Sequence, residues 1–247
     1  VGIEAIDLLS GVPNKCGVYN IEMKCDNSTV YQCQLEKVPF AENKYLNAHT
    51  DYEYRRITGR WINRSFLLPN NQLSIYNSPK KSGVLALTDD SLHHIQYNLL
   101  DVYNNATQMN FKLKSTAIAP LVVKDTSPFF VKTFSFDKDN SYTTDDFKLY
   151  VPAKCVYQNF NFEFKKNPGI NKLSDVYVVH NQLVPLHKEV TLSIKSLTEP
   201  LHPEKLVAVN AENNNKSYLT GTYINSWFNF NSRNLGNFYL EEDLAAP

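Results

Sequence analysis

Two histidines and a glutamate in the second half of the chain could together hold a metal ion. His180 and His187 flank a predicted turn, and Glu189 follows close behind. Zinc hydrolases use three ligands of this kind and leave a fourth position open for water or substrate. The alternative is a pair of histidines on a solvated loop, which we favour. His180 and His187 are therefore zinc candidates without an assigned role.

A second pair of histidines, His93 and His94, is adjacent in the sequence. Both fall on a predicted strand, where successive side chains point to opposite faces of the sheet. We therefore expect that these two imidazoles do not share a metal ion.

Acidic side chains crowd the segment 137–146. Asp137, Asp139 and Asp145 offer the hard oxygen ligands that calcium prefers. An EF-hand loop also needs a glycine, and Tyr142 stands at that position. The alternative is an acidic turn in contact with solvent, which we favour. The three aspartates are calcium candidates only.

Other signatures of chemistry are missing from the sequence. It contains no GxSxG nucleophile elbow, no glycine-rich phosphate loop and no HExxH zinc motif. Trp61 and Trp227 could stack on sugar rings, but both stand among strand-like residues, which favours core packing. We assign no catalytic, cofactor-binding or metal-binding residue, and expect no cofactor in this segment.

The composition favours β-strands and excludes several classes of partner. The chain of 247 residues has 15 Tyr and 14 Phe, and Lys plus Arg equal Asp plus Glu at 25 each. Without a basic excess we expect no nucleic-acid partner. No apolar run approaches the roughly 20 residues that span a bilayer, so we expect no membrane span.

One segment, residues 41–54, does not alternate as a strand does. Four of its side chains recur at helical spacing and would share one face: Tyr45, Leu46, His49 and Tyr52. We predict a short helical crossover whose apolar face closes the core of the first domain. The alternative is a long irregular loop.

The first predicted hairpin pairs residues 18–25 with 29–37. Its turn places Met23 opposite Tyr31 and Ile21 opposite Cys33. Cys25 and Cys33 then lie too far apart along the hairpin for a disulfide, so we interpret them as small buried apolar residues. The other strands predicted in the first half are 61–68, 72–76, 92–102 and 107–113.

The alternation lapses after residue 113 and resumes in the second half. Strands are predicted there at 130–136, 147–151, 160–164, 176–180, 190–194, 206–209, 218–223, 227–230 and 238–240. The fold class is therefore all-β, with two β-sandwich domains, the first immunoglobulin-like with one short helical crossover. We place the domains at 1–116 and 128–247, joined by a linker at 117–127.

Several stretches together resemble a known family. They include GIEAIDLLSGVPNKCGVYNIEM, PFAENKYLNAHTDYEY, NNQLSIYNSPKKSGVLAL, LLDVYNNATQMNFKL, VHNQLVPLHKEVTLSI and LTGTYINSWFNFNSRNLGNFYL. Their order resembles the region downstream of the catalytic domain in large secreted lysostaphin-like zinc metallopeptidases of Bacteroidetes-type bacteria. The resemblance covers nearly the whole chain.

That resemblance implies a secreted or cell-envelope protein of the peptidoglycan endopeptidase group. The family holds zinc with a His and an Asp of one motif and a His of a His-x-His motif, and this sequence has no His-x-His. We therefore expect zinc only in a catalytic domain upstream of Val1. The segment itself is expected to be a non-catalytic accessory, targeting or spacer region. Its expected partner is peptidoglycan, or a cell-surface glycan or protein.

Two other functions stay open. A stand-alone surface module that binds glycan or protein is the first alternative. An enzyme with an unrecognised site is the second.

Overall fold

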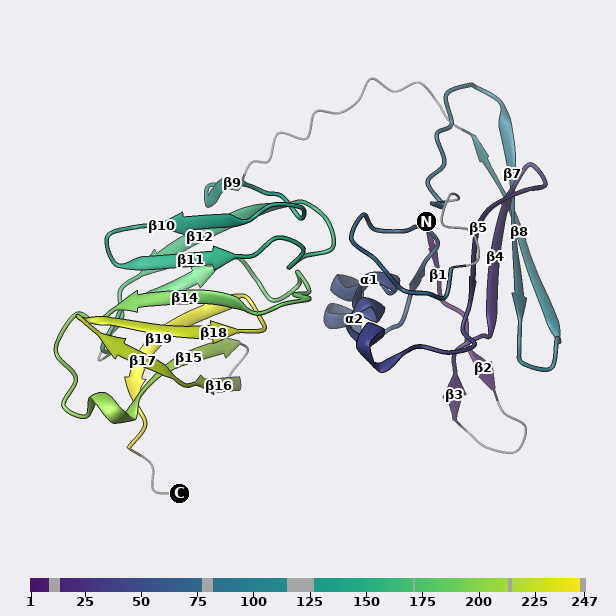
Figure 1. Cartoon of the computed structure of the whole chain (residues 1–247). Coiled ribbons are helices and arrows are strands. Elements are labelled where there is room, and N and C mark those ends of the chain that lie inside the picture. The colour runs from purple at the N-terminus through teal and green to yellow at the C-terminus, as the bar shows by residue number, and fades with distance from the viewer. Residues whose placement is uncertain (9–13, 77–81, 115–126, 171, 213–214, 245–247) are drawn as a thin grey trace. The chain divides into compact units, whose positions relative to one another are not determined.

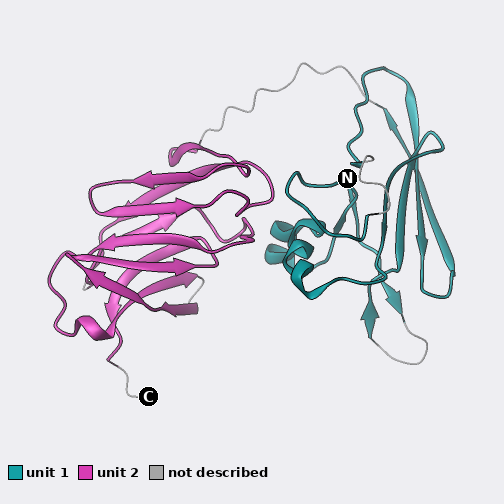
Figure 2. Cartoon of the chain, in the orientation of Figure 1, with its two compact units in different colours: residues 1–122 teal, residues 123–247 magenta. Residues whose placement is uncertain are grey.

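The structure is a computed structural model that describes residues 1–8, 14–76, 82–114, 127–170, 172–212 and 215–244. The chain divides into two compact units, residues 1–122 and 123–247 (Figure 2), and each unit encloses its own hydrophobic core. Of the predicted linker, 117–127, only Ser127 falls within the described residues. Strands dominate both units, which confirms the all-β class.

The main sheet of unit 1 is antiparallel, with the strand order β5-β4-β7-β8 (Figure 1). Its strands are β4 (Asn20–Cys25), β5 (Ser28–Gln34), β7 (Leu92–Leu100) and β8 (Ala106–Lys114). Met23 pairs with Tyr31 and Ile21 pairs with Cys33, so the predicted register of the first hairpin is confirmed. Cys25 pairs with Ser28 and not with Cys33, and all four cysteines are free thiols.

Short elements and extended segments cover the buried face of this sheet. Two small sheets pair β1 (Gly2–Ile3) with β6 (Asn63–Arg64) and β2 (Asp7–Leu8) with β3 (Lys15–Cys16). Ile3, Leu73 and Ile75 are buried in one cluster with the inward side chains of β4, β5 and β7. The immunoglobulin-like expectation therefore holds for the β class and the antiparallel hairpins. The layer that packs on the main sheet is built from these shorter pieces.

Two of the strand predictions in unit 1 are wrong in extent. Within residues 61–68 the structure forms only the two-residue β6, and within 72–76 it forms a single bridge from Tyr76 to Cys33. Leu73 and Ile75 are buried while Ser74 is exposed. Their alternation reflects burial against the sheet and not membership of a long ladder.

The helical crossover is present but consists of three pieces. They are η1 (Phe40–Tyr45), α1 (Leu46–His49) and α2 (Tyr52–Thr58). Thr50 interrupts the predicted helix because it is extended and bridges to Asn63. Tyr45 and Leu46 pack against the core cluster, which confirms the prediction for these two residues of the face. Tyr52 belongs to the next helix and is half-buried.

Unit 2 is a sandwich of two antiparallel sheets. One has the order β10-β11-β14-β18-β17 and the other β16-β15-β19-β13-β12-β9 (Figure 1). The strands are β9 (Phe130–Phe134), β10 (Asn140–Thr143), β11 (Phe147–Val151), β12 (Phe160–Asn167), β13 (Val176–Val179), β14 (Val190–Lys195), β15 (Leu206–Glu212), β16 (Asn215–Leu219), β17 (Gly221–Ile224), β18 (Trp227–Ser232) and β19 (Gly236–Glu242). One short helical turn, η2 (Pro203–Lys205), precedes β15.

Aromatic side chains fill the space between these two sheets. Phe134 and Phe162 are fully buried and stack with ring centroids 4.4 Å apart, and Phe147 stacks on Tyr177 at 5.0 Å. Phe160 and Phe164 pack against the same cluster, as the alternation of 160–164 predicts. In the described parts of both units, no helix has the length and apolar character that a membrane crossing requires.

Candidate functional site

The tight turn between β4 and β5 brings reactive side chains to the end of the main sheet of unit 1. Asp26 and Asn27 form the turn with positive φ angles of 48° and 65°, a conformation that suits Asp, Asn and Gly in two-residue hairpins. The Asp26 amide donates to the His94 carbonyl at 2.9 Å, and the His94 amide donates to Asp26 Oδ1 at 2.9 Å. These two bonds fix the Asp26 carboxylate against β7.

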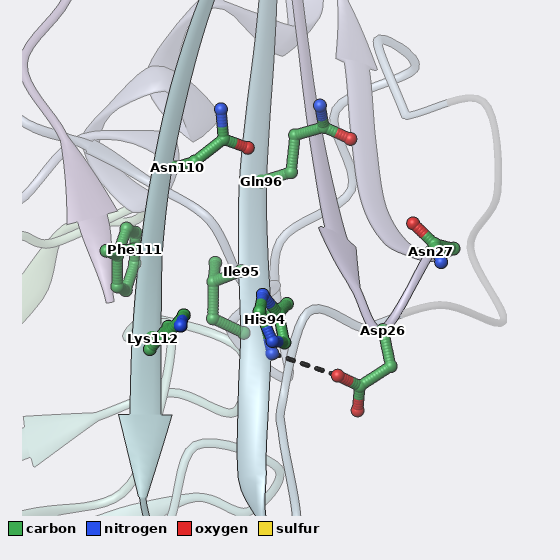
Figure 3. Close-up of a pocket in the computed structure, with 8 residues that line it drawn as sticks. All are labelled: Asp26, Asn27, His94, Ile95, Gln96, Asn110, Phe111 and Lys112. Carbon is green, nitrogen blue, oxygen red and sulfur yellow. Dashed lines mark hydrogen bonds between the residues drawn. The ribbon is translucent and has the colours of Figure 1, made fainter.

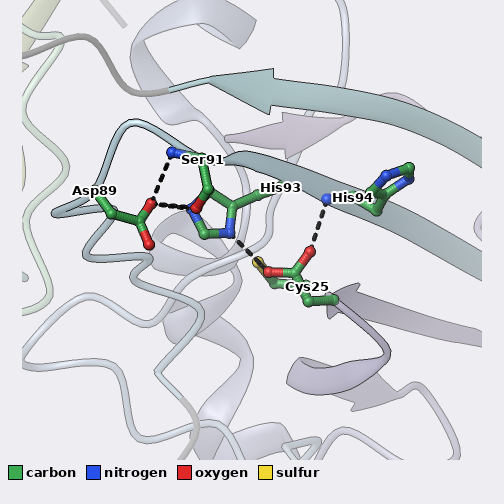
Figure 4. Close-up of polar contacts among 6 residues, drawn as sticks. Cys25, Asp89, Ser91, His93 and His94 are labelled. Atoms are coloured by element: carbon green, nitrogen blue, oxygen red, sulfur yellow. Dashed lines mark hydrogen bonds and ion pairs between the residues drawn. The ribbon is translucent and has the colours of Figure 1, made fainter.

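His93 lies between two carboxylates (Figure 4). Its Nδ1 is 2.7 Å from Asp26 Oδ2, and its Nε2 is 2.9 Å from Asp89 Oδ1. The hydrogen bond to Asp26 and then that to Asp89 raise the pKa of His93. The bond with His93 lowers the pKa of Asp26, and bonds from Ser91 and then His93 lower that of Asp89. With an acceptor at each ring nitrogen, the arrangement favours the imidazolium.

The Cys25 thiol completes this cluster. Cys25 Sγ is 3.7 Å from Asp26 Oδ2, and burial followed by the nearby Asp26 charge raises the pKa of the thiol. One ligand atom each from Cys25, Asp26 and His93 lie within 4.8 Å of one another. Among the described residues, this is the one group of three or more His, Cys, Asp or Glu side chains with that spacing.

On the other face of β7, a pocket follows the outer surface of the sheet (Figure 3). His94, Gln96, Asn110 and Lys112 line it together with Asp26, and its volume is about 540 Å³. His93 and His94 thus serve different surfaces, as strand geometry dictates. Ile95 and Phe111 add apolar groups to this polar lining, but the pocket is open to solvent, so it encloses little apolar area for a small-molecule ligand.

A second hollow in unit 1 contains an exposed aromatic ring. Trp61 is 51% exposed, and the guanidinium carbon of Arg55 lies 3.4 Å from its ring centroid. The hollow, of about 660 Å³, is also lined by Glu4, Lys15 and Arg60. Arg60 Nε donates to Glu4 Oε2 at 3.0 Å, which restrains both side chains. Trp61 is therefore at the surface and not in the core.

The zinc candidates of unit 2 occupy separate environments. The His180 ring lies against Phe160 in a tilted arrangement, with the ring centroids 5.0 Å apart, and burial lowers the pKa of His180. His187 Nδ1 is 3.2 Å from the Tyr157 hydroxyl. Glu189, the third residue of the predicted set, accepts from Arg233 at 3.0 Å. The structure keeps these three side chains in separate environments and does not gather them as a ligand set.

The calcium candidates lie at opposite ends of a strand. Asp137 and Asp139 precede β10, and Asp145 follows it. Asp139 Oδ1 accepts from the Ala153 amide at 2.8 Å, and Asp137 accepts from the Ser135 hydroxyl. A strand of four residues separates its ends by roughly 13 Å, which is too far for the ligands of one ion. The segment consists of β10 and the turns on either side of it.

Sequence reasoning missed the cluster at the β4–β5 turn. The residues Cys25 and Asp26 are far from His93 in the sequence, and they meet because β4 pairs with β7, where Cys25 lies opposite Ile95. The available signal was the adjacent Cys25 and Asp26 at a predicted turn. It required the non-local pairing of β4 with β7, which local periodicity does not predict.

Comparison with known proteins finds a similarity for one part of the chain. Residues 131–243, within unit 2, match the Zu5-like domain. The chain has no match among curated proteins.

Proposed function

We propose that this chain is a non-catalytic accessory region of a secreted cell-wall metallopeptidase, and that it holds, spaces or targets that enzyme. On this proposal, the zinc-containing catalytic domain belongs to a part of the protein outside this chain. Two β units with separate cores support it, because such units are suited to serve as tandem modules. The sequence resemblance supplies the class of substrate, peptidoglycan.

The exposed Trp61 is the observation that favours targeting over simple spacing. Sugar rings stack on aromatic faces, and their hydroxyl groups bond to charged and amide side chains at the rim of a pocket. Arg55 restrains the Trp61 ring, while Glu4, Lys15 and Arg60 supply polar groups around it. A restrained ring loses less conformational entropy when a ligand binds. The Trp61 hollow is thus the proposed glycan-binding surface of unit 1.

A stand-alone surface module that binds glycan or protein is the alternative, and the same hollow would serve it. The two proposals differ in what precedes Val1 in the encoded protein. A His-x-His and a zinc His/Asp motif there support the peptidase, whereas a lipoprotein leader supports the stand-alone module.

Binding to insoluble peptidoglycan tests the targeting role. The full chain should co-sediment with purified Gram-negative sacculi in a saturable way. Trp61→Ala should weaken this binding about tenfold or more, since a buried Trp contact commonly contributes 2 kcal/mol or more. Phe40→Ala is the matched control, because Phe40 is an aromatic residue of unit 1 that is 94% exposed and outside the hollow.

The variants separate the two parts of the proposal. Equal binding by wild type and Trp61→Ala would move the glycan surface elsewhere. A wild-type chain that stays in the supernatant at all concentrations would overturn targeting altogether.

A further inference from the structure

The cluster at the β4–β5 turn has the donor set of a transition-metal site. A thiol, a carboxylate and an imidazole converge there, with one atom from each lying within 4.8 Å of the others. Zinc-class cations accept these three ligand types, at about 2.3 Å to sulfur and about 2.0–2.2 Å to nitrogen or oxygen. Tetrahedral ligands at such lengths lie roughly 3.3–3.6 Å apart. The observed 3.7 Å from Cys25 Sγ to Asp26 Oδ2 is already close to that separation.

The side chains around these three are arranged as outer-shell partners of a metal site. A metal-bound histidine usually donates its other ring N–H to a carboxylate, which fixes the tautomer and the ring orientation. His93 has this partner in Asp89, 2.9 Å from Nε2. Asp89 is itself held by the Ser91 hydroxyl at 2.6 Å and the Ser91 amide at 3.2 Å.

The Asp26 ligand is oriented in the same way. Its Oδ1 accepts from the His94 amide, which leaves Oδ2 directed at His93 Nδ1 and Cys25 Sγ. The backbone of the turn therefore fixes one carboxylate oxygen and presents the other to the cluster.

We propose that Cys25 Sγ, Asp26 Oδ2 and His93 Nδ1 bind a divalent cation of the zinc class, with Asp89 orienting His93 from the outer shell. The cation takes the place of the proton between His93 Nδ1 and Asp26 Oδ2, now 2.7 Å apart, and this pair opens by roughly 0.6 Å. The thiol binds as thiolate and releases its proton. Three protein ligands leave a fourth position for water.

Metal binding would join the β4–β5 turn to the start of β7. This role is independent of the proposed accessory function, because the cluster lies among residues that the Trp61 hollow does not include.

Cobalt(II) titration of the reduced full chain tests the site without reference to activity. A tetrahedral thiolate complex gives an intense sulfur-to-cobalt charge-transfer band, and we expect this band to saturate at one equivalent and to disappear when zinc is added. Cys25→Ser should abolish the band. Cys16→Ser is the control, because Cys16 is another partly buried thiol of unit 1 and should leave the band unchanged.

Two further variants separate inner-shell from outer-shell roles. Asp89→Asn should keep the band but lower zinc affinity about 10–100-fold, as the loss of outer-shell partners commonly does. His94→Gln replaces the neighbouring side chain and should leave affinity unchanged. The absence of a charge-transfer band in the wild type at millimolar cobalt, or its persistence in Cys25→Ser, would overturn the proposal.

Discussion

Acidification should destabilise unit 1 through one buried histidine, His49. This side chain is 2% exposed; its Nδ1 is 3.1 Å from the Tyr76 hydroxyl, and its Nε2 is buried without a hydrogen-bond partner. Burial, and then the nearby Arg64 charge, lower the pKa of His49 to about 4. The Arg64 guanidinium is itself 3.4 Å from Asp51. The folded state therefore holds His49 neutral.

The sign and size of the effect follow from proton linkage. An unfolded histidine has a pKa near 6.5, so below that pH the unfolded chain binds more protons than the folded chain. The free energy of unfolding must then fall between pH 6.5 and about 4. For one histidine with these two pKa values, the loss amounts to about 3 kcal/mol at pH 4.

Urea unfolding at pH 7 and pH 4 measures this loss against a non-titrating variant. His49→Gln retains a polar side chain but cannot bind a proton, so carboxylates that titrate in both proteins cancel in the comparison. The chain has two tryptophans, one in each unit, and a Trp227→Phe background makes the fluorescence of Trp61 report on unit 1 alone. Wild type should lose about 3 kcal/mol more than His49→Gln. Equal losses would refute the buried, neutral His49.

Further predictions concern the cores and the crossover. Leu46→Ala should lower the free energy of unfolding by about 1–3 kcal/mol, because Leu46 packs against the core of unit 1 while only half-buried. Asn43→Ala, at an exposed position, should change it little in the same thermal or urea unfolding experiment. Equal stabilities of the two variants would mean that the face is not packed. Phe162→Ala should cost about 3–5 kcal/mol in unit 2, where Phe162 is fully buried and stacks on Phe134; a loss below about 1 kcal/mol would contradict this packing. Gly59→Ala should lower the free energy of unfolding by about 1 kcal/mol, because Gly59 follows α2 with a φ of 74°, a backbone conformation that strains alanine. The added Cβ would meet no neighbouring atom, so the cost comes from the backbone alone. An unchanged melting temperature would contradict this backbone strain. Residues 1–122 and 123–247, expressed separately, should each fold and unfold cooperatively, and an unfolded unit would show that the cores depend on one another.

The features predictable from the sequence are those that depend on neighbouring residues. The turn that follows Cys25 set the register of β4 and β5, and the period of two agrees with it, because a slip by one residue would move Met23 and Tyr31 off the buried face. The same period located the buried Phe162 between partly buried Phe160 and Phe164. Helical spacing located the crossover and its inward face.

The features that escaped prediction depend on contacts between distant parts of the chain. Thr50 interrupts the crossover because it bridges to Asn63, and nothing within residues 41–54 indicates this partner. Leu73 and Ile75 alternate like a strand although they pack as a covering segment. The group formed by Cys25, Asp26 and His93 exists only once β4 lies beside β7.

The central claim, that this chain binds the cell wall without cleaving it, is tested by one incubation. The purified full chain is mixed with peptidoglycan sacculi, the pellet is assayed for bound protein, and the supernatant is analysed for released muropeptides. We predict saturable binding in the pellet and no muropeptides beyond those released without protein. Protein that remains in the supernatant, or muropeptides that accumulate with time, would contradict the claim.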